Sequence, residues 1–276
     1  MILVTGATGN AGGAVVRALV NSGERVRAVV RDPDRAPLPA GVEVAAADLN
    51  DPGTLVPHFE GVSAAFLLSG YEGLNETLAE MRRAGVERVV LLSSSAAPTG
   101  DMTNAVARYH IVSERAVRQS GLGWTFLQPN TFMTNTFQWT AQLQQGNLIR
   151  APFPDVRVAT IDPDDIAAVA AVALRSAAGE GRAYRLSGPE SLSPADRVAI
   201  LAEVLGRELR FAGQTDEETR AEMSASMPAE YVDAFFRFFV AGDLDESAVL
   251  PTVEEVTGRG PRNFEAWARA HADAFR

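Results

Sequence analysis

Short hydrophobic runs alternate with helical segments through the first half of the chain. The runs are continuously apolar, which is typical of strands buried on both faces of a sheet. They predict strands at Ile2–Thr5, Val26–Val30, Val42–Ala46, Ala64–Leu68, Val89–Leu92 and Thr125–Leu127. Strands that alternate with helices through short connections predict an α/β fold with a doubly wound, mostly parallel sheet.

Glycines separate the helical segments from the strands that follow them. Apolar residues repeat at helical spacing from Val15 to Val20, and Gly23 stands just beyond them. Gly85 and Gly121 follow later helical segments in the same way. A glycine directly after a helix favours the left-handed backbone that closes its last turn. These positions therefore predict where three helices end.

The pattern changes after residue 130. Thr131–Gln145 predicts a helix of polar and aromatic residues, and a short extended segment is expected around Leu148. Pro163 starts an Ala- and Val-rich helix, and Ala183–Leu186 is expected to return a strand to the sheet. From Thr215 onward the chain is predicted to be helical. Most of this second half is expected to form a smaller, mainly helical cap on the sheet.

The composition narrows the class of partner. The 276 residues include 25 Lys and Arg against 35 Asp and Glu, a net charge of −10, whereas nucleic-acid binding needs a basic face. With no Cys, the chain has no disulfides or thiolate metal ligands. No cationic leader precedes the first apolar residues, and the longest apolar run, Ile166–Leu174, is too short to cross a bilayer. We expect a cytoplasmic protein that binds a small molecule, and neither nucleic acid nor a membrane.

One glycine-rich segment carries the strongest functional signal. Between the first predicted strand and the first predicted helix, the chain reads V-T-G-A-T-G-N-A-G from Val4 to Gly12. Glycines let the backbone approach a pyrophosphate, and the helix N-terminus that follows offers free N–H groups and a positive dipole end. The residues expected to bind a nucleotide here are Gly6, Thr8, Gly9, Asn10, Ala11 and Gly12.

The spacing G-x-x-G-x-x-G resembles the short-chain dehydrogenase/reductase superfamily, and T-G-A-T-G-N-x-G resembles its NmrA-like, atypical branch. The resemblance extends to about residue 175, while the last hundred residues match only in general character. It is carried further by Val30-Arg31-Asp32-Pro33, Ala47-Asp48-Leu49, His110-x-x-x-Glu114, Ser120-Gly121, Trp124-Thr125, Pro129, Phe132-Met133 and Asn135, in the order of quinone-reductase-like members.

The resemblance and the pattern together predict a domain division. Residues 1–130 are expected to form an NAD(P)-binding domain of the Rossmann type, to which residues 155–187 return. Residues 131–154 and 188–276 are expected to form the substrate-binding cap.

The residue after the second predicted strand bears on the choice of cofactor. An acidic side chain there accepts a hydrogen bond from the ribose of NAD, whereas this chain has Arg31, 19 residues after Gly12. A guanidinium pairs with the 2′-phosphate of NADP. Asp32 is the alternative, because it would reach the ribose of NAD if the strand ended one residue later. NADP(H) is therefore favoured, and NAD(H) remains possible.

The usual catalytic Tyr-x-x-x-Lys of this superfamily is broken. Tyr109 is followed by Ser113 at that spacing, and aligning on Glu114 instead puts His110 at the Lys position and Val106 at the Tyr position. His110 is expected to bind the nicotinamide ribose or to donate a proton; the alternative is a helix-surface histidine without a role. Neighbouring side chains on a helix diverge by about 100°, so only one of Tyr109 and His110 is expected to face the cofactor.

Other candidates lie at the carboxyl ends of the predicted strands, where open α/β sheets bind ligands. Ser95 has the catalytic-serine position of the family but is expected only to line the site, and Leu68 and Ser69 are expected to lie along the cofactor. Asp48 and Leu49 resemble the pair that flanks the adenine, although Asp48 also suits a helix N-cap. The aromatic residues expected at the mouth of the substrate pocket are Phe132, Phe137 and Trp139.

Two further clusters have plainer interpretations. Asp162, Asp164 and Asp165 suit the start of a helix better than a metal site, and no metal is expected. The segment Phe235–Phe239 is read as helix core, or alternatively as an apolar roof over an aromatic substrate.

Two functions follow from the resemblance. The first is NADPH-dependent reduction of a small aromatic or quinone-like acceptor, with the hydride supplied by the cofactor. The alternative is a non-catalytic NAD(P)-binding redox sensor of the NmrA type, which acts through a protein partner. Both need the same glycine-rich segment.

Overall fold

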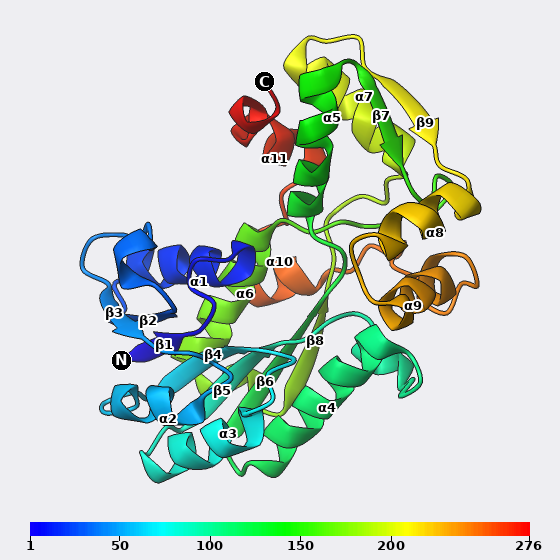
Figure 1. The fold of residues 1–276 in the computed structure, drawn as a ribbon. Helices are drawn as coiled ribbons and strands as arrows, with labels where there is room; N and C mark the ends of the chain where they lie inside the picture. The colour runs from blue at the N-terminus through cyan, green and yellow to red at the C-terminus, as the bar shows by residue number, and fades with distance from the viewer.

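The computed structural model describes residues 1–276 and contains a seven-stranded parallel sheet (Figure 1). In spatial order its strands are β3 (Glu43–Ala46), β2 (Val26–Val30), β1 (Ile2–Val4), β4 (Ala64–Leu68), β5 (Arg88–Leu92), β6 (Gly123–Pro129) and β8 (Arg182–Leu186). The chain order reverses between β1 and β4, which opens a crevice at the carboxyl ends of these strands. The predicted doubly wound parallel sheet is confirmed.

Helices cover both faces of the sheet (Figure 1). One face carries α1 (Asn10–Asn21), α6 (Pro163–Arg175) and α10 (Thr252–Thr257), and the other carries α2 (Pro52–Leu55), α3 (Leu74–Arg83) and α4 (Ala105–Gln119). Their apolar side chains fill two separate hydrophobic cores, one on each side of the sheet. The sheet is therefore a rigid platform whose carboxyl edge is free for a site.

The two edge strands depart from the expected burial. In β3 only Ala45 is buried, and in β8 only Leu186 is buried. Each edge strand has one neighbour in the sheet, so its outer residues meet water. The expectation of burial on both faces holds for central strands such as β4 and is wrong for β3.

The three predicted helix-terminating glycines are confirmed. Gly23, Gly85 and Gly121 follow α1, α3 and α4 with φ of +79°, +84° and +77°. Glycine adopts this left-handed conformation without the steric cost of a Cβ.

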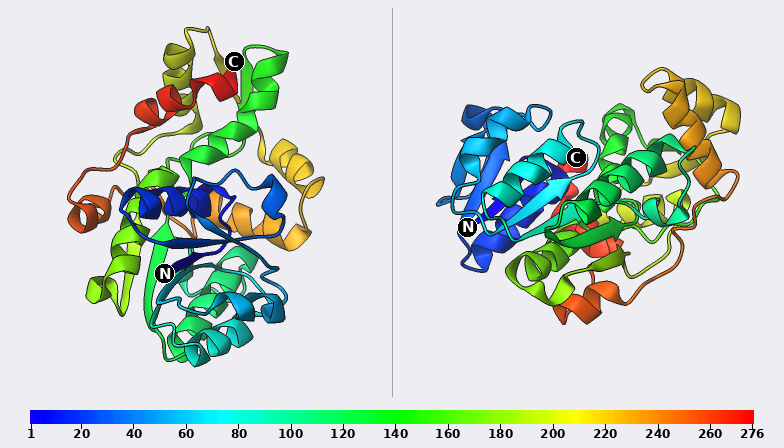
Figure 2. Two further views of the ribbon diagram at one scale, coloured as in Figure 1. Left: turned by 90° about the vertical axis from the view of Figure 1, so that its left-hand side faces the viewer. Right: turned by 90° about the horizontal axis from the view of Figure 1, so that it is seen from below.

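A smaller cap stands beyond the carboxyl edge of the sheet (Figure 2). Its core is aromatic, with Trp139, Phe264, Trp267 and Phe275 nearly inaccessible to solvent. It is built from α5 (Thr140–Gln145), β7 (Leu148–Ala151), α7 (Pro194–Leu205), β9 (Arg210–Gly213) and α11 (Phe264–Ala270), with β7 and β9 paired in parallel. The helix expected over Thr131–Gln145 is instead a 3₁₀ helix at Met133–Trp139 followed by α5.

The remaining C-terminal helices do not all belong to the cap. α8 (Asp216–Ser224) and α9 (Ala229–Phe239) form a pair beside α4, where Asn104 Nδ2 donates to the Ala234 carbonyl at 3.2 Å. α10 packs against α6 and β8, with Val253 fully buried. Residues 252–257 thus contribute to the sheet domain, although the segment 188–276 was expected in the cap.

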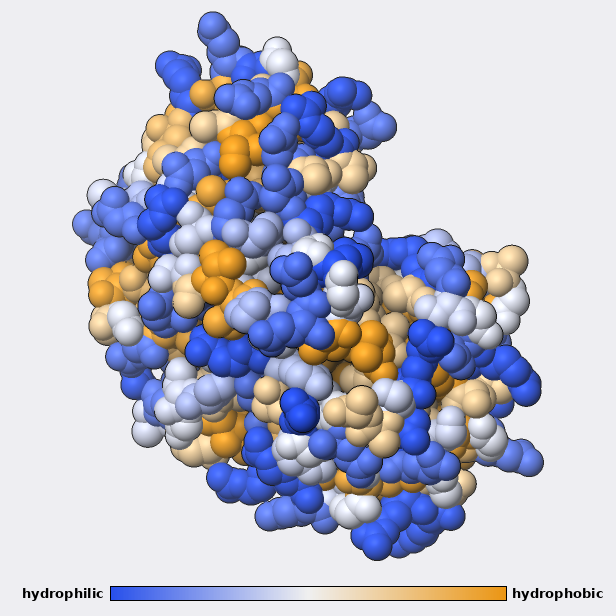
Figure 3. Space-filling model, turned by 180° about the vertical axis from the view of Figure 1, so that it is seen from behind, coloured by the Kyte–Doolittle hydropathy of each residue, from blue (hydrophilic) through white to orange (hydrophobic).

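The outline of the molecule has a notch between the cap and the lobe that holds β1 to β3, visible from behind (Figure 3). No helix in the structure is both long and apolar enough to cross a membrane.

Candidate cofactor-binding and active site

The turn between β1 and α1 requires glycine at two positions. Gly6 has φ of +60°, and a Cβ there would lie 2.5 Å from Leu68 Cδ1. A Cβ on Gly12 would lie 2.2 Å from the Gly6 carbonyl oxygen. Any side chain at Gly12 would therefore push the turn apart, which explains the tight spacing of these glycines.

The N-terminus of α1 is free to bind an anion. Gly9 is its N-cap, no side chain caps it, and the first helical hydrogen bond runs from the Gly13 N–H to the Gly9 carbonyl at 2.8 Å. The N–H groups of Asn10, Ala11 and Gly12 are therefore left for a ligand.

These residues fit a pyrophosphate. A Cβ on Gly9 would have one neighbour within 4 Å, the Gly6 carbonyl oxygen at 3.3 Å, so the space above Gly9 is open. Thr8 is exposed on the same turn, and Asn10 Nδ2 donates to Thr134 Oγ1 at 3.2 Å, which links the turn to the cap. The geometry is that of a nucleotide-binding turn at the switch point of the sheet.

The far end of this crevice carries the residues expected around adenosine. Arg31 is exposed directly after β2 and makes no hydrogen bond or salt bridge. Burial raises the pKa of Tyr71; the positive charge of Arg31 opposes this rise, and the negative charge of Asp48 adds to it. Half-buried Leu49 lines the same small cleft as Tyr71. Tyr71 had no sequence signal.

Asp48 holds a turn, and it does not cap the next helix. Its carboxylate accepts from the Asn50 N–H at 3.0 Å, while Asp51 caps α2 by accepting from the Gly53 N–H at 3.2 Å. The helix-cap alternative for Asp48 is therefore wrong.

A cavity of about 400 Å³ lies at the carboxyl ends of β4, β5 and β6. Among the residues that line it are five of the predicted site residues, Leu68, Ser69, Ser95, His110 and Phe132. The Ser69 hydroxyl donates to the Leu92 carbonyl at 2.8 Å, so its side chain ties β4 to β5. The nicotinamide end of a cofactor that starts at the glycine turn would reach this cavity.

Tyr109 and His110 both line the cavity, and that only one of them faces the cofactor stays a prediction. Their ring centroids are 4.1 Å apart. His110 is 9% exposed, its Nδ1 has no partner, and burial lowers its pKa from 6.5 to about 4. Burial raises the pKa of Tyr109. At neutral pH the imidazole is uncharged and the phenol keeps its proton.

The residues around the broken catalytic motif hold the site together. Ser113 Oγ accepts from the Gly70 N–H at 3.1 Å and donates to the Tyr109 carbonyl at 2.8 Å. Buried Glu114 accepts from Ser93 Oγ at 2.6 Å and from Gln128 Nε2 at 2.8 Å. These bonds fix the strand ends that frame the cavity.

Glu246 is a cavity residue that sequence reasoning missed. It is 5% exposed, and its carboxylate accepts from Ser95 Oγ at 2.6 Å, from Thr131 Oγ1 at 2.6 Å and from the Thr131 N–H at 3.0 Å. Burial raises the pKa of Glu246, and the hydrogen bonds from Ser95 and Thr131 oppose that rise. Ser95 and the buried acid therefore line the cavity as a hydrogen-bonded pair.

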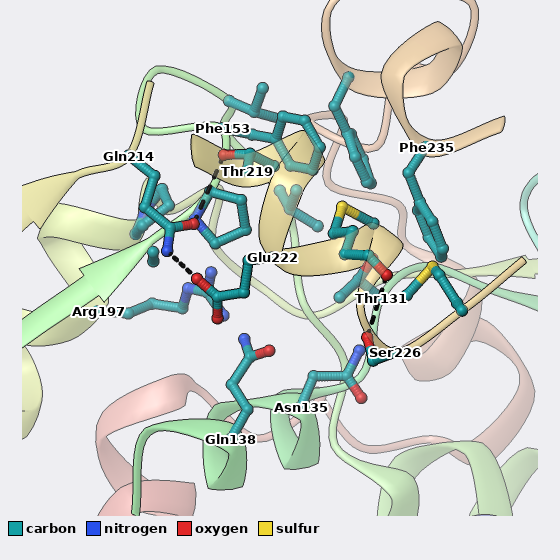
Figure 4. Close-up of a pocket in the computed structure, with 18 of the residues that line it drawn as sticks. Thr131, Asn135, Gln138, Phe153, Arg197, Gln214, Thr219, Glu222, Ser226 and Phe235 are labelled. Carbon is teal, nitrogen blue, oxygen red and sulfur yellow. Dashed lines mark hydrogen bonds between the residues drawn. The ribbon is translucent and has the colours of Figure 1, made fainter. Parts of the chain in front are cut away.

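A second cavity, of about 560 Å³, adjoins the first (Figure 4). Thr131, Asn135, Phe235 and Phe239 line both cavities, so the cavity at the strand ends and the cavity in the cap are neighbours with a shared wall. The outer cavity is walled by Phe153, Met223 and Met227 and by polar groups on α7 and α8. Phe235 and Phe239 form a roof over both cavities, Phe238 is largely buried and lines the inner one, and Phe236 is buried.

Two of the three aromatic residues expected at the pocket mouth lie elsewhere. Phe132 lines the inner cavity. Trp139 is 1% exposed inside the cap, and Phe137 stacks on Phe275 with ring centroids 5.3 Å apart. Phe137 and Trp139 therefore build the cap, and Phe153, Phe235 and Phe239 take the place expected for them.

The acidic cluster after β7 begins α6, as expected. Asp162 is the N-cap and accepts from the Asp164 N–H at 3.0 Å. Asp162 also pairs with Arg262 at 2.8 Å, and buried Asp165 pairs with Arg259 at 2.8 Å. The cluster is thus a helix start held by two arginines.

The fold and the site together define a dinucleotide-binding protein with a pocket at the carboxyl ends of its central strands. Residues 6–177 match the family model described as NAD(P)H-binding. The chain belongs to this family, and the predicted resemblance to NmrA-like and quinone-reductase-like proteins is confirmed at the level of the fold.

Similar proteins cover the whole chain. It is 39% identical over 280 residues to the (4-alkanoyl-5-oxo-2,5-dihydrofuran-3-yl)methyl phosphate reductase of Streptomyces griseus, covering 100% of this chain and 99% of the relative. It is 35% identical to the NAD(P)H azoreductase of Xenophilus azovorans, covering 100% and 99%. The solved structure of the Escherichia coli quinone oxidoreductase QOR2 with NADPH superimposes with a TM-score of 0.81 at 22% identity, covering 99% of this chain and all of that one.

Proposed function

We propose that the protein is an NAD(P)H-dependent oxidoreductase that reduces a small aromatic or quinone-like acceptor. The observation that carries this proposal is that the two cavities share lining residues, which places an aromatic-walled pocket in the cap next to the strand ends beside the glycine turn. A cofactor and a flat acceptor would meet where the cavities adjoin. The reductase and azoreductase names of the two relatives support this reading.

The residues of the chain position the reactants and exclude water. The free N–H groups of α1 and the glycine turn would hold the pyrophosphate, and NAD(P)H supplies a hydride when bound. Phe235, Phe239 and Phe132 would press the acceptor ring toward the strand ends. The enzyme would act chiefly by aligning the cofactor with the acceptor. The lysine of the usual Tyr–Lys pair has no charged replacement in this chain.

Proton supply is the second task of the site. Uncharged His110 offers an N–H or a lone pair to the cavity but no acidic proton at neutral pH. Buried Glu246 holds a proton to higher pH than an ordinary glutamate, and it lines the cavity together with its hydrogen-bond partner Ser95. We assign His110 to positioning and the Glu246–Ser95 pair to the proton path.

A steady-state screen that follows NADPH absorbance with quinones, azo dyes and aldehydes tests the proposal. Turnover of at least one quinone or azo dye above background supports it. Tight NADPH binding with no turnover of any acceptor contradicts it and favours the non-catalytic redox sensor.

NADPH is expected to bind more tightly than NADH. Arg31 is exposed and unpaired, so a charge-assisted pair with the 2′-phosphate should contribute about 1.5 kcal/mol, or roughly tenfold in Kd. Arg31→Ala should remove most of this difference and leave NADH binding unchanged. Titration of both cofactors into both proteins measures it. Equal affinities in the parent protein would instead point to Asp32 as a ribose ligand.

Tyr109→Phe is expected to keep at least about half of the parent kcat, because burial raises the pKa of this phenol and no cation activates it. His110→Ala should lower kcat about tenfold or more, because the reactants lose a group that positions them. An inactive Tyr109→Phe beside an active His110→Ala would reverse the assignment.

With a pKa of about 4, His110 does not change its protonation state between pH 6 and 8, so it should leave kcat constant over that range.

A further inference from the structure

One charged side chain in the outer cavity has no partner. Arg197 lies in the first turns of α7, is 9% exposed and lines the cavity within the cap (Figure 4). Its Nε is buried without a hydrogen bond, and its terminal nitrogens make no hydrogen bond or salt bridge to the protein. Its guanidinium carbon stands 5.1 Å from the centre of the Trp139 ring, which supports it from behind.

This arrangement is unfavourable unless something else compensates the charge. A buried guanidinium loses its hydration, and the N-terminal end of a helix repels a cation. Burial lowers the pKa of Arg197 to about 10, so the group is still positive at neutral pH. The face of the Trp139 ring attracts the guanidinium, but it offers no hydrogen-bond acceptor and leaves the N–H groups of Arg197 without partners.

The groups that face Arg197 leave its charge open to the cavity. Glu222 is the one carboxylate that lines the cavity, and Gln214 Nε2 donates to it at 2.5 Å without any salt bridge between Glu222 and Arg197. Asp196, the neighbour on α7, pairs with Arg157 on the outside at 2.9 Å. Gln138 and Asn135 add neutral amides from the 3₁₀ helix below (Figure 4).

We propose that the outer cavity binds an acceptor that carries an oxyanion, a phosphate or a carboxylate, and that Arg197 pairs with that group. The aromatic or unsaturated part of the acceptor then lies under Phe235 and Phe239, where the two cavities adjoin, and its anionic tail extends into the cap. A planar guanidinium suits this role because it binds two oxygens of one oxyanion at once. This inference rests on the proposed function, since it names the class of substrate for the same pocket.

The test is direct binding, measured separately from turnover. Phenyl phosphate, benzoate and benzyl alcohol are titrated by calorimetry into protein saturated with NADP⁺, so that the phosphate sites of the cofactor are occupied. We expect the two anions to bind and the alcohol to bind at least tenfold more weakly; the stronger of the two anions identifies phosphate or carboxylate as the preferred group. Arg197→Met should weaken the preferred anion at least tenfold, and Arg197→Lys should weaken it less.

Two further variants separate anion recognition from structure. Arg150→Met removes an exposed arginine that pairs with Glu218 at 2.7 Å outside the cavity, and it should leave anion affinity unchanged. Glu222→Gln removes the opposing charge in the cavity and should tighten anion binding. Arg197→Met should unfold at the same temperature as the parent or higher, because it removes an unpaired buried charge.

Anion affinity that is equal in the parent and Arg197→Met overturns the inference, as does equal binding of benzyl alcohol and phenyl phosphate. If Arg197→Met fails to fold, unchanged anion affinity in Glu222→Gln overturns it instead. Anion binding that depends on Arg197 in a protein that reduces no acceptor supports the anion site and removes the proposed reductase activity, so the two proposals fail separately.

Discussion

Gly9→Val is expected to weaken NADPH binding by at least about 100-fold, or about 2.7 kcal/mol, while the protein stays folded. A side chain at Gly9 meets little protein, since the Gly6 carbonyl oxygen is 3.3 Å from its Cβ position. It would instead occupy the space above the free N–H groups of α1, where the pyrophosphate must lie. Fluorescence titration with NADPH measures the loss, and circular dichroism and thermal unfolding check the fold.

Two other glycines calibrate that result. Gly12→Ala should destabilise the protein as well as prevent binding, because its Cβ would stand 2.2 Å from the Gly6 carbonyl oxygen. Gly260→Ala should change neither property, because nothing lies within 4 Å of its Cβ position. Parent-like affinity in Gly9→Val would mean that the cofactor does not bind over this turn.

The stability of the protein should fall in mild acid because of His110. Its pKa is about 4 in the folded chain against 6.5 ordinarily, so below pH 6.5 the unfolded chain takes up a proton that the folded chain refuses. The unfolding free energy therefore decreases as the pH falls from 6.5 to 4, and the total loss due to His110 is about 3 kcal/mol. Between pH 7 and pH 5 the loss from this group is about 2 kcal/mol.

His110→Gln removes this titration and supplies the comparison. The raised pKa values of Asp162 and Glu246 act in the opposite direction, because the folded chain holds those protons more tightly, so total stability alone does not isolate His110. The difference in unfolding free energy between the parent and His110→Gln, measured by urea denaturation at pH 7 and pH 5, cancels their effect. If the unfolding free energy falls equally in both proteins between pH 7 and pH 5, His110 is protonated as readily in the folded chain as in the unfolded chain.

The parts of the site that could be predicted from the sequence are local in the chain. The glycine turn can be predicted from nine consecutive residues, because its glycines themselves determine its backbone geometry. Arg31 can be placed because the apolar run before it shows where the second strand ends. The inner cavity was anticipated at Ser95 and Leu68 because parallel strands bring their carboxyl ends to one edge.

The parts that were missed depend on distant segments or on a change of helix type. Met133, Thr136 and Trp139 are spaced by three and all are buried, since a 3₁₀ helix repeats every three residues. In an α-helix, with about 3.6 residues per turn, these three side chains would not point in the same direction. The sequence therefore predicts Trp139 at the pocket, whereas the 3₁₀ helix turns it into the core of the cap. Glu246 and Arg197 carry no local motif, because each gains its role only when remote segments fold around it.

The hydrogen bond from Ser95 to Glu246 joins residues 151 positions apart, and it sets a condition on folding as well as on the site. The nucleotide turn forms from the first residues to be synthesised, yet the wall of the cavity is closed by a segment near the end of the chain. Contacts of such long range slow folding, because the loop between them must be closed before they give any stability. A nascent chain that ends before residue 246 thus has the cofactor turn but lacks the acid that bonds Ser95 and Thr131, and the wall of the inner cavity is complete only once the segment around Glu246 has docked.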